Sequence, residues 1–172
     1  MTALPSEHPM TVAGGGARQV LTFWLGSEGY CVDILRVQEI RVWAPVTRIP
    51  KLPPDVLGVL NLRGSIVPIV DLRVRFNLSN CEFTPLTVVI ILSIKTSSGE
   101  RDFGLVVDGV SDVIDISEEN LQKAPNLGNR AVVGFIQGLV IVADRMLILL
   151  NLDELLCRDS EHLPAADLAS VA

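Results

Sequence analysis

The sequence predicts a mainly β protein built from two small antiparallel barrels, and three observations support this fold class. Short apolar runs recur at roughly 8–12-residue spacing, separated by turn residues and without long helical patterns. Nearly half the residues (49%) are apolar but only 5% are aromatic, so Val, Ile and Leu must fill the core. The third observation is an internal repeat.

Three short strings of the first half recur in the second half in the same order. Each match alone is weak in a Val-rich chain, but three collinear matches indicate a two-fold structural repeat. The pairs are Val37–Ile40 with Val110–Val113, Gly58–Asn61 with Gly134–Gln137, and Ile69–Leu72 with Leu149–Leu152.

In the first half, apolar runs predict strands over residues 20–25, 30–33, 34–43, 59–62 and 66–70. The third run is extended throughout or begins with a short turn. Asp55–Leu57 is predicted to form one helical turn, which Gly58 ends. Pro68 has no amide hydrogen to donate, so its strand is predicted to lie at a sheet edge or to carry a bulge.

At the end of the first half, Asp71 is placed to cap a short helix that extends through Phe76. Further strands are predicted over residues 86–94, 102–107, 110–116, 131–137, 139–143 and 146–150, with a turn over 96–99. Asn151 and Glu154 have the spacing of a capping box, which predicts a final helix running to about Arg158.

Both ends of the chain differ in composition from the part between them. Residues 1–16 contain two prolines and a run of three glycines, which predicts a flexible N-terminal arm. Residues 158–172 are predicted to be a flexible acidic tail, which leaves 17–157 as the folded part. No secretory signal pattern is visible, and no apolar stretch approaches the roughly 18 residues that a membrane span needs. We therefore expect a cytoplasmic protein that does not insert into the membrane.

The charge distribution favours a protein partner. The net charge of −6 argues against a general nucleic-acid binder. Residues 17–80 carry eight basic and five acidic residues, whereas residues 81–172 carry six basic and fourteen acidic ones. The basic half is only mildly basic, so a protein surface suits it better than a phosphate backbone.

The residues that catalysis would need are missing from the predicted core. Both histidines, His8 and His162, fall in the predicted arms, which removes the usual general base and metal ligand. Cys31, Cys81 and Cys157 form no C-x-x-C pair, and Cys31 is expected to be a reduced thiol buried in a strand. We expect no enzyme activity, no metal and no cofactor.

Three acids gather in one stretch of the second half, namely Asp108, Asp112 and Asp115. They are interpreted as a solvated face rather than as a paired-carboxylate site. A binding protein is therefore the favoured class.

The most informative residues are Glu39, in an extended run, and Arg63, at the tip of an Asn-Leu-Arg-Gly turn between two apolar strands. Two interpretations remain open. The two side chains could form an ordinary surface ion pair, worth under about 1 kcal/mol. Alternatively, they could fix the register of a partner in a docking groove whose apolar side chains supply the affinity.

Several strings of the chain resemble the chemotaxis coupling protein CheW family. The resemblance covers roughly residues 17–157, and the Asn-Leu-Arg-Gly turn followed by Val-Pro-Ile-Val-Asp-Leu-Arg is its most specific part. The matching strings are Ile34–Ile40, Val46–Pro50, Gly58–Gly64, Ile66–Arg73, Gly104–Val113 and Asp144–Leu149.

This resemblance implies two intertwined five-stranded SH3-like barrels with short helices, and no catalytic activity. Members of the family act as adaptors that bridge the cytoplasmic hairpin tips of chemoreceptors and the regulatory domain of the histidine kinase CheA. The protein would then be recruited to membrane-associated receptor arrays. An adaptor of a non-chemotactic chemosensory kinase pathway is the alternative. A small-molecule-binding barrel or a thiol enzyme using Cys31 is a third reading, which the scarcity of convergent polar groups disfavours.

The resemblance also assigns roles to individual positions. Four residues match receptor-facing positions between the barrels: Glu39, Arg63, Ile66 and Val88. Two others match positions that contact the kinase: Val37 and Gly58.

Overall fold

The computed structural model describes residues 18–78, 81–123 and 134–156. The arms predicted over 1–16 and 158–172 lie outside these ranges, so their flexibility stays a prediction. The first three residues of the strand predicted over 131–137, and the end of the last predicted helix, also lie outside them.

The described part is mainly β, as predicted, with a few short helices. Its strands are β1 (Arg18–Leu25), β2 (Glu28–Asp33), β3 (Val37–Val42), β4 (Val56–Leu62), β5 (Ser65–Asp71), β6 (Val88–Thr96), β7 (Gly99–Val107), β8 (Gly109–Ile116), β9 (Leu121–Gln122), β10 (Ile136–Val142) and β11 (Arg145–Leu150). The helices are η1 (Ile34–Arg36), α1 (Leu72–Arg75), η2 (Glu118–Asn120) and a last short helix over residues 152–156.

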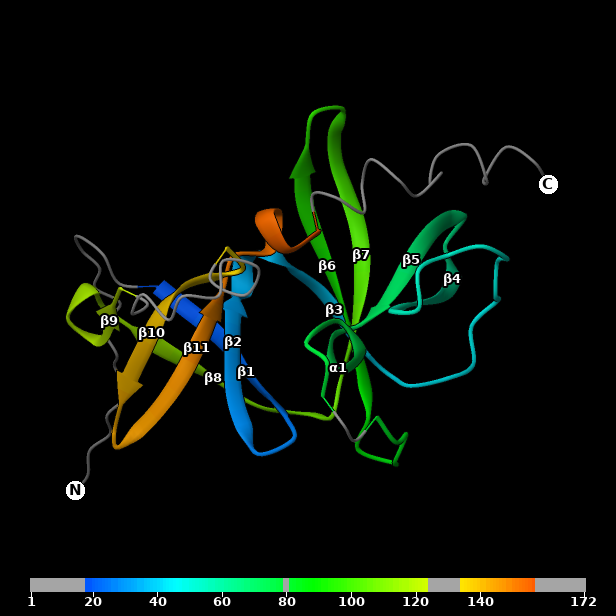
Figure 1. The fold of residues 1–172 in the computed structure, drawn as a ribbon. Helices are drawn as coiled ribbons and strands as arrows, with labels where there is room; N and C mark the ends of the chain where they lie inside the picture. Colours follow the sequence, from blue (N-terminus) through cyan, green and yellow to red (C-terminus); the bar gives the residue numbers. More distant parts are fainter. Residues whose placement is uncertain (1–17, 79–80, 124–133, 157–172) are drawn as a thin grey trace, which may run out of the picture.

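The strands form two sheets that exchange segments of chain. A five-stranded sheet has the order β3-β6-β7-β5-β4, and a six-stranded sheet has the order β8-β1-β2-β11-β10-β9. Figure 1 shows the two sheets side by side, with β3 crossing from the β1–β2 hairpin into the five-stranded sheet and β8 crossing back. The β1–β2 and β6–β7 hairpins thus each give their following strand to the other sheet, so the two halves are intertwined.

The two sheets repeat one topology, which confirms the internal repeat seen in the sequence. In the five-stranded sheet, β3 pairs antiparallel with the β6–β7 hairpin, and β7 pairs parallel with β5 of the β4–β5 hairpin. In the six-stranded sheet, β8, the β1–β2 hairpin and the β10–β11 hairpin have the same arrangement. Only the two-residue β9 is additional, which is why this sheet has six strands instead of five.

Both sheets curl until their opposite edges approach each other. In the five-stranded sheet, Thr47 follows β3 and exchanges two backbone hydrogen bonds of 2.8 and 3.1 Å with Val59 of β4. In the six-stranded sheet, the side chain of Asn120 donates a 3.2 Å hydrogen bond to the carbonyl of Ile141 on β10. Closure of this kind protects edge strands that would otherwise present free backbone groups.

The apolar core has three parts, which this architecture explains. One cluster lies inside the curled five-stranded sheet and is centred on Val67, Ile69, Val89, Ile91 and Val106. A second lies inside the six-stranded sheet and is centred on Val20, Cys31, Ile116, Val140, Leu147 and Leu149. The largest cluster draws on both sheets and holds them together, with Phe23, Val70, Leu92, Phe103 and Leu150 among its buried members.

Two local predictions for the first half are wrong. Asp55–Leu57 is not a helical turn, because β4 begins at Val56, which pairs with Val70 of β5. Pro68 is not on an edge strand, since β5 lies between β4 and β7, and the register irregularity falls in β4 between Val56 and Gly58. The ladder from β5 to β7 begins only at Ile69, so the missing amide of Pro68 removes no bond from it.

Other local predictions hold. Asp71 caps α1, where its side chain accepts a hydrogen bond from the backbone of Arg73, and Phe76 ends the helix. The side chain of Asn151 accepts from the backbone of Glu154 at the start of the last helix. In the second half, the boundaries of the hairpin strands differ from the predicted ones. The β6–β7 hairpin is longer than predicted, since its strands extend to Thr96 and Gly99. Within the residues described, one strand, β10, replaces the two predicted over 131–143.

Candidate functional site

Glu39 and Arg63, which lie 24 positions apart in the chain, meet in the structure. An Arg63 Nη2 atom lies 3.1 Å from Glu39 Oε2, and Arg41 also reaches the same carboxylate at 3.4 Å. Arg63 is 84% exposed and Glu39 is 26% exposed. The pair joins β3 to the β4–β5 turn, which are the two edges of the five-stranded sheet, so it marks the rim where that sheet closes.

The position of Arg63 follows from the turn that carries it. Arg63 and Gly64 are the two residues between β4 and β5, and both have positive φ, 52° and 89°. Positive φ at both central residues is the geometry of a tight hairpin turn that suits the twist of the strands. The side chain of Asn61 accepts a 3.0 Å hydrogen bond from the Gly64 amide. The turn therefore holds Arg63 at an exposed tip, where its donors can reach both Glu39 and a partner.

Ile66 lies beside this ion pair. It lines a hollow of about 740 Å³ together with Gln38, which precedes Glu39, and with Gly64, which follows Arg63. Ser93, Thr96 and Asp102 of the β6–β7 hairpin line its other side. Burial and the charge of Glu100 raise the pKa of Asp102 above its ordinary value. The hollow is thus lined mostly by polar residues, with Ile66 and Val67 as its apolar residues.

Val88 belongs to an apolar stripe on the other face of the same sheet edge. Val88 pairs with Val42 across β6 and β3, so the two side chains share a face, and Ile40 lies on that face two residues before Val42. Ile40, Val42 and Leu86 are exposed large apolar residues, at 43%, 71% and 65%. We call Ile40, Val42, Leu86 and Val88 the apolar stripe.

The edge strand β3 therefore separates two kinds of surface. Glu39 pairs with Ile91, which faces the interior of the five-stranded sheet, whereas Ile40 and Val42 point to the opposite face. A partner that covers this edge would touch the charged pair on one side and the apolar stripe on the other. The four residues predicted to face the receptor are thus divided between two surfaces: Glu39, Arg63 and Ile66 lie at the rim where β3 meets the β4–β5 hairpin, and Val88 lies on the apolar stripe.

The two residues matched to the kinase have internal structural roles as well. Val37 begins β3 and packs, half-buried, against the large core cluster. Gly58 is buried, with φ of 153°, and a Cβ at this position would lie 2.2 Å from the Thr47 carbonyl oxygen. Leu35, two residues before Val37 in η1, is 84% exposed and is the accessible apolar side chain of this region.

The structure adds a second ion pair that corresponds to the first. Asp112 on β8 and Arg145 at the start of β11 lie 3.5 Å apart on the rim of the six-stranded sheet. The Thr22 hydroxyl donates a hydrogen bond to Asp112 and lowers the pKa of that carboxyl. The repeat could have revealed this pair, because Asp112 stands in the string that matches Glu39.

A buried charge cluster also escaped the sequence analysis. Arg73 is fully buried and donates from Nε and Nη2 to the two carboxylate oxygens of Asp71, at 2.9 and 3.0 Å, and from Nη1 to Asp108 at 2.9 Å. Burial alone would lower the pKa of Arg73, but the hydrogen bonds and charges of Asp71 and Asp108 outweigh it and raise that pKa. Nothing in the sequence indicates that Arg73 points inward, and only the folded structure shows it.

The three acids of the second half do not converge on one site. Asp108 binds Arg73, Asp112 binds Arg145, and Asp115 accepts a 2.9 Å hydrogen bond from Gln19. The solvated-face interpretation therefore fails for Asp108, whose side chain is only 23% exposed. A paired-carboxylate site is absent from this stretch.

The geometry gives little basis for thiol or metal chemistry. Cys31 is buried in β2, as predicted, and burial raises the pKa of its thiol to about 12, so the thiolate is scarce at neutral pH. In residues 18–78, 81–123 and 134–156 no three His, Cys, Asp or Glu side chains gather as they would around a metal ion. Over the same ranges, no helix has the length and apolar character needed to cross a bilayer.

Comparison with known proteins agrees with this architecture. The model of the CheW-like domain matches residues 19–160. The chain is 43% identical over 150 residues to the chemotaxis protein CheW of Klebsiella aerogenes, covering 87% of each chain. It is 38% identical over 138 residues to the chemotaxis protein CheW of Rhizobium meliloti, covering 80% of this chain and 86% of that one.

A solved structure supports the fold as well. The crystal structure of the scaffolding protein TtCheW from Thermoanaerobacter tengcongensis superposes with a TM-score of 0.71 at 30% identity. It covers 78% of this chain and 88% of that chain. The similarity thus extends over the residues of both sheets rather than over one half of the chain.

Proposed function

Since the chain belongs to the CheW-like domain family, we propose that it is a non-catalytic adaptor that couples chemoreceptors to the histidine kinase CheA. The match over residues 19–160 carries this proposal, because it includes every strand of both sheets. The partners would be the cytoplasmic hairpin tip of a receptor and the regulatory domain of the kinase. The protein would act in the cytoplasm, at membrane-associated receptor arrays.

The edge of the five-stranded sheet supports the receptor side of the proposal. Apolar contacts from Ile40 and Val42, which are exposed, and from the half-buried Val88 would supply affinity, since exposed apolar side chains mark interaction surfaces. Glu39 and Arg63 would fix the register of the receptor helices, since charged groups give specificity and orientation more than raw affinity. Ile66 would contact the partner from the adjoining hollow.

An adaptor of a non-chemotactic kinase pathway would use the same surfaces. The names of the relatives favour the chemotactic role, since both curated relatives cited above are chemotaxis proteins. Reconstitution decides between them: the chain should raise CheA autophosphorylation only when a chemoreceptor cytoplasmic fragment is also present. A chain that binds neither partner would contradict the proposal.

Removing either member of the rim ion pair should weaken receptor binding. We expect Glu39→Ala and Arg63→Ala each to raise the Kd for a receptor fragment about tenfold, because a register-fixing charge is lost at the rim of the contact. Calorimetry with the purified fragment measures the change. Asp112→Ala is the matched control, since it breaks the corresponding pair on the other sheet and should leave the receptor Kd unchanged. Equal weakening by all three variants would contradict the receptor-facing role of this edge.

The kinase-facing surface is proposed to include Val37 and Gly58, with Leu35 as its accessible apolar side chain. We expect Leu35→Arg to weaken binding of the kinase regulatory domain at least about tenfold while receptor binding persists, because Leu35 is 84% exposed and its replacement spares the core. Binding of each partner is measured separately. Val42→Arg, on the apolar stripe, should show the reverse pattern. If Leu35→Arg leaves kinase binding at the level of the parent, this surface is assigned wrongly.

A further inference from the structure

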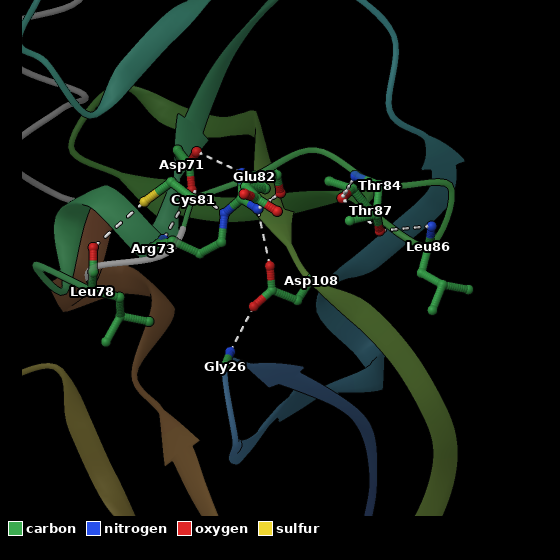
Figure 2. A network of polar contacts seen from close by, with 10 residues as sticks. All are labelled: Gly26, Asp71, Arg73, Leu78, Cys81, Glu82, Thr84, Leu86, Thr87 and Asp108. Carbon is green, nitrogen blue, oxygen red and sulfur yellow. Dashed lines mark hydrogen bonds and ion pairs between the residues drawn. The ribbon is translucent and has the colours of Figure 1, made fainter.

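A set of polar contacts, called the polar bridge below, joins the β1–β2 turn of the six-stranded sheet to α1, which follows β5 of the five-stranded sheet. Asp108 stands between β7 and β8, where the chain passes from the five-stranded sheet to the six-stranded one. Its Oδ1 accepts from Arg73 at 2.9 Å, and its Oδ2 accepts a 2.6 Å hydrogen bond from the Gly26 amide in the β1–β2 turn. Figure 2 shows Asp108 between these two donors. One carboxylate thus ties the turn of one sheet to α1 of the other.

The bridge continues from Arg73 toward the receptor-facing edge. Arg73 Nη1 also donates to the carbonyl of Glu82 at 2.5 Å, and the guanidinium lies 4.8 Å from the ring centre of Phe83. Phe83 stacks on Trp43, with ring centres 4.4 Å apart and planes 15° from parallel. Trp43 directly follows β3, the strand that carries Glu39 and two of the four residues of the apolar stripe, Ile40 and Val42.

Each contact in the series from Arg73 to Trp43 is direct and restricts the orientation of the groups that it joins. Arg73 has no exposed surface and is held by two carboxylates, so its guanidinium plane has one available orientation. A flat guanidinium over an aromatic face, with a second ring stacked beyond it, transmits a displacement of the first group to the last. The Trp43 amide donates a 3.1 Å hydrogen bond to Thr87, which closes the loop that holds Phe83 against it.

We infer that Asp108 and Arg73 are positioning residues that couple the β1–β2 turn to the end of β3 through Phe83 and Trp43. A shift of one sheet relative to the other would then displace the end of β3, at the edge proposed to contact the receptor. Conversely, a displacement of that edge would shift one sheet relative to the other. The consequence for signalling rests on the proposed function, whereas the coupling within the chain does not. Coupling energies between sites in proteins are commonly modest, which suits an adaptor that must respond to its partners.

The first test uses the isolated chain and needs no partner. In Asp108→Asn, the rate of amide hydrogen exchange, followed by NMR, should rise at Gly26, which loses an ionised acceptor. The rate should also rise about tenfold or more at Trp43, which Asp108 does not touch. Asp153→Asn is the matched control. Asp153 also accepts two bonds from an arginine, Arg36, and one from a backbone amide, but it is not linked to Trp43. Parent-like exchange at Trp43 in Asp108→Asn would overturn the inference.

The second test separates coupling from binding. In the reconstituted system, Asp108→Asn should lower receptor-dependent kinase stimulation about tenfold while the Kd values for receptor and kinase fragments each change less than about threefold. Phe83→Leu, at a position that is 46% exposed, should give the same loss, and the double variant should lose no more than either single one. Additive losses, or a stimulation that falls only in step with binding, would overturn the inference. Failure of the parent chain to bind either partner would instead contradict the proposed function.

Discussion

Arg73→Met is expected to cost about 3–5 kcal/mol of unfolding free energy, the largest loss of any single substitution considered for this chain. The substitution fills most of the space of the side chain but leaves the carboxylate of Asp71, which is 2% exposed, without its counter-charge. Asp108 loses a 2.9 Å partner at the same time. Urea denaturation followed by tryptophan fluorescence gives the change.

Two further variants show whether the lost charge pairing is the cause. Arg63→Met removes the same group at an 84% exposed site and should change the unfolding free energy by no more than about 0.5 kcal/mol. Asp71→Asn combined with Arg73→Met removes the unpaired buried charge and should recover part of the loss. A double variant as unstable as Arg73→Met alone would mean that packing, and not charge, dominates at this site.

Gly58→Ala is expected to be the second largest effect, at about 4 kcal/mol, because two penalties combine. Gly58 has a φ of 153°, which a residue with a side chain rarely adopts. The new Cβ would also lie 2.2 Å from the Thr47 carbonyl oxygen, which belongs to the bridge that closes the five-stranded sheet. Thermal or urea unfolding of the variant measures the loss.

Gly99→Ala separates the two penalties. Gly99 also has positive φ, 118°, but a Cβ there meets no heavy atom within 4 Å. Replacing Gly99 should lower the unfolding free energy by only about 1–2 kcal/mol, which is the penalty for backbone strain without a steric clash. Equal losses at the two sites would show that the close approach to Thr47 is not restrictive. A large loss at Gly58 also means that reduced kinase binding in a Gly58 variant would not by itself identify a contact.

The sequence predicted the repeated units well because each depends on local pattern. The alternation of apolar residues located most strands, and Asp71 was recognised as a helix cap because capping needs only a side-chain oxygen at the right spacing. The predicted turn over Asp55–Leu57 failed because pairing of Val56 with Val70 outweighs the local tendency to form a turn. Pro68 was predicted to lie at an edge or at a bulge, because the sequence does not show that the neighbouring ladder begins one residue later.

The candidate site divides in the same way. Glu39 and Arg63 were singled out from their positions in the strand and the turn, and the structure brings them to 3.1 Å. The contact of Glu39 with Arg63 and the corresponding pair of Asp112 and Arg145 required the curled sheets, whereas Glu39 and Arg41 share a face of β3 two residues apart. The sequence treated Asp108 as one of three solvated acids, since nothing near it in the chain indicates a buried arginine partner.

By itself the sequence determined the β class, the two-fold repeat and the residues at the tip of the Asn-Leu-Arg-Gly turn, because these depend on residues close together in the chain. Only the tertiary structure decided that β3 and β8 cross between the sheets, and that Asp108 therefore lies between Arg73 of one sheet and Gly26 of the other. The physical reason is that a buried ion pair forms only where distant segments are pressed together and water is excluded. Such an arrangement depends on how the whole chain packs, and no short string of residues records it.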